Sequence, residues 1–462
     1  MRVDVIDRIE DFAALAADWN RVYKADERAR YFLSHPFLSG WLPTLKQNWL
    51  VLAARDGRNG PHRAFFPLRI SATRRRDGSY ANVIYMAGNY GADYTGMICE
   101  PAIEREAVSA FAARFKQMHW QAINLDYVPA GDHRYKLFAA HFPKATFAVD
   151  RERRINLRDN VDNLVCPWAR LPGSFEDYLA GLSANMRQKL RRLLRALDTD
   201  PRLTIELSTA RTFEADLAAL GRLWAGKWGE RKGAARTVSL LNASRALVRQ
   251  VWASGDLFMP VLRRNGEVVA ILAIFLDRQK RVAHFYMTGR DESFEGPAPG
   301  LLLHAWSIRQ LIGEGCIVYD FMRGNEPYKW LFGSEPMYLQ CLRVTTRSGR
   351  NLGGRLDRRS LPVVIEGATQ MHRKGKFAEA EAAYLQVLAL EPDNLHAIYR
   401  YAQLLETRGD YGRAGKLYRR LLAHNPRSTK VWQHIADCLE HLGYIDEARA
   451  AARRAEHNLT IN

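Results

Sequence analysis

A repeat with a period of 34 residues occupies the last hundred residues and constrains the fold more than any other feature. Glycine, alanine, proline and aromatic residues each recur at this spacing. A glycine closes a turn between two helices, small residues let paired helices approach closely, and a proline ends the second helix. The repeated residues are Gly375, Gly409 and Gly443; Ala380, Ala414 and Ala448; Pro392 and Pro426; Phe377, Tyr411 and Ile445; and Tyr384 and Tyr418.

Helix pairs with this period resemble tetratricopeptide repeats. We place three of them at about 361–394, 395–428 and 429–462; the third departs late, since Thr460 stands where proline is expected. The resemblance implies an all-α solenoid whose concave groove holds a protein partner. Two other roles stay open: dimerisation, and covering an edge of the rest of the protein. Nothing in the repeats predicts chemistry.

Residues 161–350 are expected to form a mixed α/β unit. Apolar or β-branched runs at 257–263, 268–276 and 282–288 are separated by turn residues and predict three strands. Residues 300–313 have helical spacing, and 316–321 read as a buried strand. The predicted order is β-β-β-α-β.

Residues 1–160 repeat that order. Strands are expected at 50–54, 63–70 and 82–87, a helix at 102–118 and a closing strand at 122–128. Each closing strand carries an acid, Asp126 in the first unit and Asp320 in the second. We therefore predict an α+β fold with two tandem units, 1–160 and 161–350, joined by a basic helix at about 174–197 and followed by the helical repeats at 361–462.

Hydropathy and cysteine usage exclude several classes of protein. The longest apolar run, 268–276, is too short for a membrane span, which needs about 20 residues. The first residues, MRVD, do not resemble a signal peptide. The five cysteines are scattered and form no Cys-x-x-Cys pair, so neither a disulfide framework nor a zinc site is expected. We expect a cytoplasmic protein without a metal.

Net charge points to anionic ligands. The chain carries 68 Lys and Arg against 50 Asp and Glu, and +16 of its net charge of +18 falls in the first 360 residues. Such a field attracts phosphorylated substrates, coenzyme A, RNA or an acidic membrane surface, without choosing among them.

Short motifs follow one another through the first 350 residues. They are FLSHPF at 32–37 with Trp41, FPL at 66–68, Asp93-Tyr94, SFEDYL at 174–179, SANMR at 183–187, and YDFMRG at 319–324 leading to Tyr328-Lys329. In this order, with the duplicated topology, the chain resembles the GNAT acyltransferase fold. More closely, it is similar to the CelD-type acetyltransferases linked to cellulose biosynthesis, relatives of the FemAB aminoacyltransferases.

The resemblance implies transfer of an acyl group, acetyl first, from acyl-CoA to an amine or hydroxyl. The acceptor would be a small molecule or saccharide related to cellulose, exopolysaccharide or the cell envelope. One alternative is FemAB-type transfer from aminoacyl-tRNA to a cell-wall precursor, the only case in which a nucleic-acid partner is expected. A second alternative, from another class, is a non-catalytic scaffold acting through its repeats.

The donor site is expected where the helix of the second unit begins. The resemblance implies that Gly300, Leu301 and Leu302 hold the pyrophosphate of acyl-CoA, because free N–H groups and the helix dipole suit an anion. An ordinary helix start is the alternative. The preceding loop carries three acids, Asp291, Glu292 and Glu295, which would repel a phosphate and favour the scaffold alternative.

Candidate catalytic and substrate-binding residues follow the last strand of the second unit. Asp320 could act as a base, orient one, or only cap the next turn. The resemblance implies that Lys329 stabilises transition-state charge; a surface lysine is the alternative. Arg323 and Glu326 are candidate substrate contacts or an ion pair, and Tyr328 is a candidate substrate contact.

The basic helix carries five cations and no acid between Arg187 and Arg195, and its leucines recur at helical spacing on one face. Its basic face could hold phosphates of a nucleotide-linked substrate, a polysaccharide precursor or tRNA, or could be merely solvated. The absence of aromatic residues weakens RNA readout. Arg187 is the candidate substrate-binding residue of this helix, because it also belongs to the SANMR motif on which the resemblance partly rests.

Overall fold

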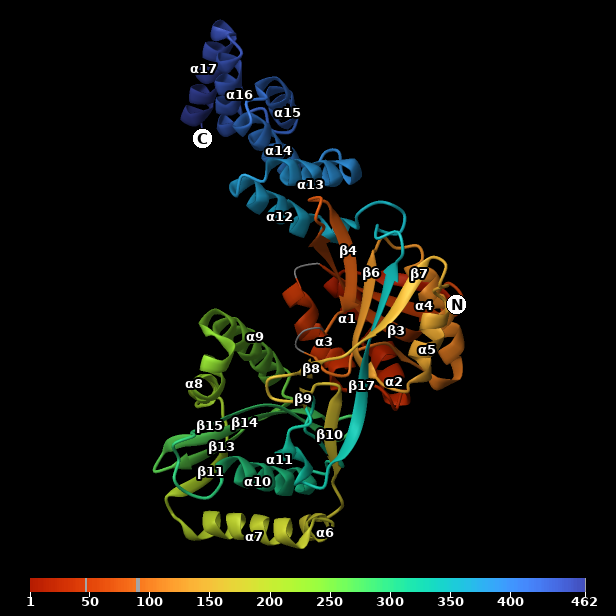
Figure 1. Cartoon of the computed structure of the whole chain (residues 1–462), viewed down its shortest axis with the longest axis vertical. Helices are drawn as coiled ribbons and strands as arrows, with labels where there is room; N and C mark the ends of the chain where they lie inside the picture. The colour runs from red at the N-terminus through yellow and green to blue at the C-terminus, as the bar shows by residue number, and fades with distance from the viewer. Residues whose placement is uncertain (46–47, 89–91, 462) are drawn as a thin grey trace.

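The computed structural model describes residues 1–45, 48–88 and 92–461. Within this part of the chain, both predicted units contribute to one mixed sheet of 15 strands, and helical repeats extend from one end (Figure 1). The main strand order is β1-β2-β3-β4-β6-β17-β10-β16-β15-β14-β13-β11. The predicted fold class, mixed-sheet α+β followed by an all-α region, is confirmed.

The first unit holds the N-terminal strands and the helices that cover them. Its strands are β1 (Arg2–Ile6), β2 (Trp49–Arg55), β3 (His62–Arg74), β4 (Tyr80–Met86), β5 (Ile98–Cys99), β6 (Ala122–Pro129) and β7 (Phe147–Glu152). Its helices are α1 (Ile9–Ala14), α2 (Ala16–Ala25), α3 (His35–Trp41), α4 (Glu104–Phe115) and α5 (His133–Ala140), with short 3-10 turns at Tyr31–Leu33, Leu42–Leu45 and Pro101–Ile103. The expected helix at 102–118 thus begins as a 3-10 turn.

The second unit continues the sheet. Its strands are β10 (Val165–Arg170), β11 (Leu203–Leu207), β12 (Leu257–Phe258), β13 (Pro260–Arg264), β14 (Glu267–Asp277), β15 (Val282–Arg290), β16 (Val318–Asp320) and β17 (Glu335–Thr346). Its helices are α6 (Phe175–Ala180), α7 (Ala184–Thr199), α8 (Phe213–Lys232), α9 (Ala234–Ala253), α10 (Pro299–Gly313) and α11 (Pro327–Trp330). Between the units, β8 (Ile155–Asn156) and β9 (Val161–Asp162) form a separate two-stranded sheet.

The two units have the same strand pairing. In the first, β2, β3 and β4 pair antiparallel and β4 pairs parallel with β6 across α4. In the second, β13, β14 and β15 pair antiparallel and β15 pairs parallel with β16 across α10. A crossover helix is the usual connection between neighbouring parallel strands.

Strand β17 joins the first unit's part of the sheet to the second unit's part. Its first residues pair with β10 of the second unit, and the rest pair with β6 and β7 of the first. The hydrophobic core is shared as well, since one cluster of buried residues includes Trp19 and Phe32 of the first unit together with Val261, Ile271 and Phe275 of the second. The two units therefore pack as one body.

The prediction of one continuous basic helix at 174–197 is wrong. The structure has two helices, α6 and α7, because Ser183 starts a new one: its Oγ accepts a hydrogen bond from the backbone N of Met186 (3.4 Å). Helices α6, α7 and α10 cover one face of the second unit's sheet, while α8 and α9, which the sequence did not predict, pack against the other.

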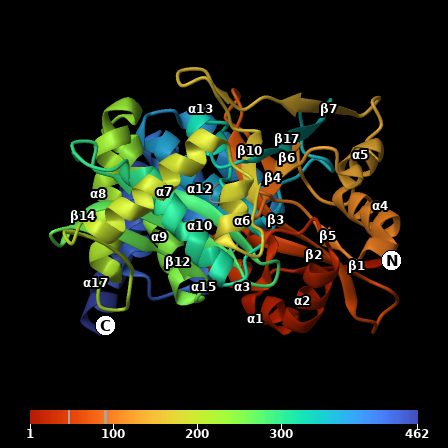
Figure 2. The ribbon, with the colours of Figure 1, turned by 90° about the horizontal axis from the view of Figure 1, so that it is seen from below.

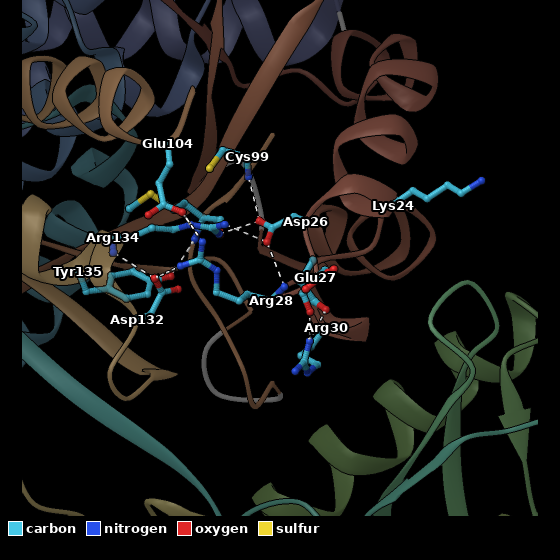
Figure 3. A network of polar contacts seen from close by, with 12 residues as sticks. Lys24, Asp26, Glu27, Arg28, Arg30, Cys99, Glu104, Asp132, Arg134 and Tyr135 are labelled. Carbon is cyan, nitrogen blue, oxygen red and sulfur yellow. Dashed lines mark hydrogen bonds and ion pairs between the residues drawn. The ribbon is translucent and has the colours of Figure 1, made fainter. Parts of the chain in front are cut away.

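A buried ion network fixes the helices of the first unit (Figure 3). The guanidinium of Arg134, 1% exposed, donates to both carboxylate oxygens of Asp26, at 2.6 and 2.9 Å. Glu104 accepts from Arg134 (3.1 Å) and also pairs with Arg28, which donates to Asp132 (2.6 Å). Every charge of this network faces an opposite one, so the buried cations and anions are mutually compensated.

Helix pairs follow a 3-10 turn at Arg358–Ser360: α12 (Leu361–Arg373) with α13 (Phe377–Leu390), α14 (Leu395–Thr407) with α15 (Tyr411–His424), and α16 (Thr429–His441) with α17 (Ile445–Ile461). They are docked on the first unit. The Gln386 amide exchanges two 2.8 Å hydrogen bonds with the backbone of Tyr80. A Cβ on Gly367 would lie 1.9 Å from the Tyr80 hydroxyl oxygen, so only glycine permits this approach.

No helix in the described ranges is both long enough and apolar enough to cross a bilayer.

Candidate active site

A cavity of about 1050 Å³ opens where the parallel strands β15 and β16 separate. The two strands pair at three positions only, ending at His284 and Asp320, and β15 then continues to Arg290 paired with β14 but not with β16. A β-bulge accompanies this change, since Ala273 pairs with Met287 and Ile274 with Phe285, which leaves Tyr286 as the extra residue. Residues 285–290 of β15 all line the cavity.

The first turn of α10 forms one wall. The helix begins at Pro299, with neither a side-chain cap nor an acid in its first turn. Gly300 and Leu301 line the cavity, and the space beside Gly300 is open, since a Cβ there would have no neighbour within 4 Å. Leu302 is fully buried in the core instead. The uncapped N–H groups suit an anion.

The three acids of the preceding loop do not line the cavity. Glu292 accepts two hydrogen bonds from Arg290, both 2.9 Å, and lies 3.6 Å from Lys227; the hydrogen bonding with Arg290 lowers its pKa. Asp291 accepts from the hydroxyl and backbone N of Ser293, which lowers its pKa. These acids therefore leave the first turn of α10 accessible to a phosphate.

Lys329 lies on α11, lines the cavity and is 3% exposed. Its ammonium donates to the carbonyl oxygens of Arg323 (2.8 Å), Gly324 (3.0 Å) and Met322 (3.4 Å) and forms an ion pair with the Glu326 carboxylate (2.9 Å). The three backbone acceptors match the three protons of the ammonium. Lys329 thus fixes the loop after β16 and places a positive charge beside the cavity.

Arg323 joins the two units at the cavity. It forms an ion pair with Asp93 of the first unit, and its guanidinium lies 3.9 Å from the ring centroid of Tyr127. All three residues line the cavity. Burial raises the pKa of Asp93 although the Arg323 charge opposes this. A carboxylate in this state is a better proton acceptor than an exposed aspartate.

Asp320 lies directly behind the cavity. It is 2% exposed, accepts from the backbone N of Met322 (2.7 Å) and lies 3.1 Å from Nδ1 of His284. Asp320 does not line the cavity, so in this structure it orients the loop of Met322 and Arg323. The fully buried Nε2 of His284 has no hydrogen-bond partner among the described residues.

His304 on α10 also lines the cavity, although no pattern in the sequence distinguishes it from a packing residue. Its Nδ1 lies 2.8 Å from the Tyr319 hydroxyl, and burial lowers its pKa to about 3. The imidazole is therefore neutral at pH 7. Glu326 and Tyr328, the candidate substrate contacts, also line the cavity.

The opposite wall was missed by sequence reasoning. It consists of the hairpin β8–β9 and one face of α8, which contribute Asn156, Asp159, Asn163, Trp224 and Trp228. A turn-rich segment between the units was the only sequence signal for the hairpin, and the Asp93-Tyr94 motif was the only one for Asp93.

Arg187, predicted to bind substrate, lies on α7 and does not line the cavity. Among the described residues, one group of side chains could hold a metal ion: Glu406, His434 and Asp437, in the repeats. His434 already contacts Glu406 (3.0 Å) and the Tyr399 hydroxyl (3.2 Å), so this group is explained by its own hydrogen bonds.

Comparison with protein families agrees with this geometry. Residues 184–330 match the family model described as an acetyltransferase (GNAT) domain. The chain carries a GNAT-type acetyltransferase domain. Residues 373–428 and 405–458 match two tetratricopeptide repeat models, which confirms the repeats and indicates protein interaction there. The matched acetyltransferase segment includes the point where β15 and β16 separate, which we call the fork, together with α10 and the loop to Trp330.

Solved structures are similar in fold. FemX superposes with a TM-score of 0.52 at 10% identity, over 74% of this chain and 97% of FemX. L-PGS from Bacillus licheniformis has a TM-score of 0.42 at 12% identity, over 79% of this chain and 97% of its own. The C-terminal domain of a putative lysylphosphatidylglycerol synthetase from Agrobacterium fabrum has a TM-score of 0.41 at 13% identity, over 74% and 93%. At these identities only the FemX-like fold is supported, and no curated protein matches the chain.

Proposed function

We propose that this protein transfers an acyl group, acetyl first, from acyl-CoA to an amine or hydroxyl of a saccharide-related envelope acceptor. The observation that carries the proposal is the open fork between β15 and β16, with the uncapped start of α10 on one side and the Arg323–Lys329 loop on the other. The link to cellulose or another exopolysaccharide belongs to the proposal and rests on the sequence resemblance.

The donor fits the α10 side of the cavity. The free backbone N–H groups of Gly300 and Leu301 would hold the pyrophosphate, an interaction that the helix dipole favours by about 0.3–1 kcal/mol. The edge of β15 between Phe285 and Arg290 offers an extended backbone beside this site. Bound acyl-CoA would supply the activated thioester.

The acceptor fits the opposite side. Trp224 and Trp228 offer aromatic surface, and Asn156, Asp159 and Asn163 offer planar polar groups. Aromatic faces with a few placed hydrogen-bonding groups suit a hydroxylated ring. The composition of this wall therefore supports a saccharide acceptor over a purely apolar one.

The transfer forms a bond from the acceptor nitrogen or oxygen to the thioester carbonyl carbon and breaks the carbon–sulfur bond. The acceptor proton passes to a base, for which we propose Asp93, and the departing thiolate takes up a proton. The developing oxyanion is favoured by the fixed charge of Lys329. Asp320 acts as a positioning residue, since it holds the backbone of Met322.

Calorimetric titration tests the donor, and release of free coenzyme A thiol with amino-sugar acceptors tests the reaction. We expect acetyl-CoA to bind with one site per chain and charged tRNA not to compete. Binding of aminoacyl-tRNA without acetyl-CoA would support the FemAB-type alternative. Binding of neither donor, with a protein still captured by the repeats, would support the scaffold.

A further inference from the structure

The basic side of α7 is a charged surface that the proposed reaction does not use. Helix α7 holds five cations between Arg187 and Arg195 and a single acid, Asp198, near its end. These cations, the α7 basic face, are Arg187, Lys189, Arg191, Arg192 and Arg195.

The cations are arranged opposite the buried side of the helix. Met186, Leu190, Leu193 and Leu194 are at most 6% exposed and pack against the sheet and α10. At about 100° per residue, the apolar residues cluster around one direction, and the five cations fan over about 200° around the opposite one. Packing of the leucine side therefore fixes the cations outward.

Most of this charge is uncompensated. Arg191 forms an ion pair with Glu176 (2.6 Å), but both side chains are at least half exposed, so the pair is weak. Arg187, Lys189 and Arg192 have no ion pair among the described residues. Figures 1 and 2 show α7 at the end of the molecule opposite the repeats, with no element over it.

We propose that the α7 basic face binds the surface of an anionic lipid bilayer. A helix of 16 residues, about 24 Å long, can lay Arg191, Arg192 and Arg195 on a plane of phosphate headgroups at once, with Arg187 and Lys189 at the two edges of the contact. The face carries no aromatic residue to stack bases, which disfavours single-stranded RNA. Since the leucines are buried in the protein, the contact is electrostatic and leaves the helix at the surface.

The contact would set the cavity close to the bilayer. Helix α7 packs on α10, whose first turn lines the cavity. Bilayer binding does not depend on acyl transfer, so the two proposals can fail separately.

Each cation near an anionic surface contributes about a factor of five in affinity, which is about 1 kcal/mol. Neutralising three of them in the variant Arg187→Gln, Arg192→Gln, Arg195→Gln should therefore weaken binding about 100-fold. A matched variant on α17, Arg449→Gln, Arg453→Gln, Arg454→Gln, removes the same charge from another exposed helix and should bind like the wild type.

Co-sedimentation of the full chain with vesicles tests this. The vesicles contain phosphatidylglycerol and phosphatidylcholine at 30:70, with pure phosphatidylcholine as the neutral control. We expect binding to the anionic vesicles only, lost in the α7 variant and in 0.5 M salt because charge is screened. Equal binding by the α7 and α17 variants would overturn the proposal, as would binding of tRNA with no binding to vesicles. A circular-dichroism melt checks that the α7 variant is folded.

Discussion

The two units share one topology, but among the described residues the fork of the first is occupied by its own chain, whereas the fork of the second is open. In the first unit, β4 and β6 also pair at three positions, from Val83 with Ala122 to Tyr85 with Asn124. Beyond that point the gap is filled by the unit's own chain: the Thr95 backbone N donates to Tyr127 O (3.2 Å), and the Thr95 hydroxyl bonds Asp126 O. Tyr94 is buried beside it. The same topology thus supplies the sheet in both units, and one loop decides whether the fork is filled or open.

The filled fork still contributes to the open one. The segment that closes it also carries Asp93, which reaches across the junction to Arg323. The buried ion pairs of the two units also differ in where they lie. The Arg134–Asp26 pair of the first unit lies in the core, whereas the Arg323–Asp93 and Lys329–Glu326 pairs line the cavity. The first unit therefore provides a wall and a carboxylate for the second.

Removing the Lys329 charge tests the open fork most strongly. Lys329→Met should lower the turnover number about 1,000-fold, because a fixed charge at the oxyanion is lost. The melting temperature should also fall, since three backbone carbonyls lose their hydrogen-bond donor. Steady-state kinetics and calorimetry measure both effects, and normal turnover in a folded variant would remove Lys329 from the mechanism.

The buried network of the first unit should affect stability alone. Arg134→Met leaves Asp26 unpaired in the core, and we expect the free energy of unfolding to fall by about 3–5 kcal/mol. Urea unfolding measures this. The remaining folded protein should keep its turnover number; a large catalytic loss at low temperature would show that the first unit does more than support the site.

Substitutions at the equivalent helix starts of the two units distinguish an effect on donor binding from an effect on folding. Gly300→Glu places a carboxylate at the first turn of α10, where space is open, and should raise the Kd for acetyl-CoA about 100-fold. The matched control is Ala102→Glu, one residue after the proline that starts the corresponding turn in the first unit. It should leave the Kd unchanged. Equal effects of the two variants would place the donor elsewhere.

Acid should weaken the second unit through His304. Its folded pKa of about 3 lies below the ordinary value near 6.5, so the unfolded chain binds more protons between these values. The stabilisation is complete above pH 6.5 and is lost as the pH falls towards 3, by about 2 kcal/mol between pH 7 and pH 5. Unfolding of wild type and His304→Asn at both pH values measures this difference. Parallel pH profiles would contradict it.

Local patterns in the sequence determined much of this architecture. Apolar runs placed β2, β3, β14 and β15 within a few residues of their ends, and the glycine spacing placed the helical repeats. Contacts between distant segments were not predictable in the same way. The pairing of β17 with β6 joins residues more than two hundred positions apart, and no local pattern encodes it.

The candidate site shows the same difference between local sequence patterns, which were predictable, and contacts between distant segments, which were not. Gly300, Leu301, Arg323, Glu326, Tyr328 and Lys329 follow one another on two segments that meet at the fork, and all line the cavity. Leu302 turns into the core because one further helical residue rotates it by about 100°. Asp93 approaches from the other unit, so its role depends on tertiary packing.

The shared strand β17 also governs the order in which the protein can be completed during translation. The ribosome makes β6 and β10 long before β17, the strand that lies between them in the sheet. Until residues 335–346 emerge, both strands keep an unpaired edge, and such edges invite association with other nascent chains. A chaperone that shields these edges would therefore act during elongation, before the helical repeats exist.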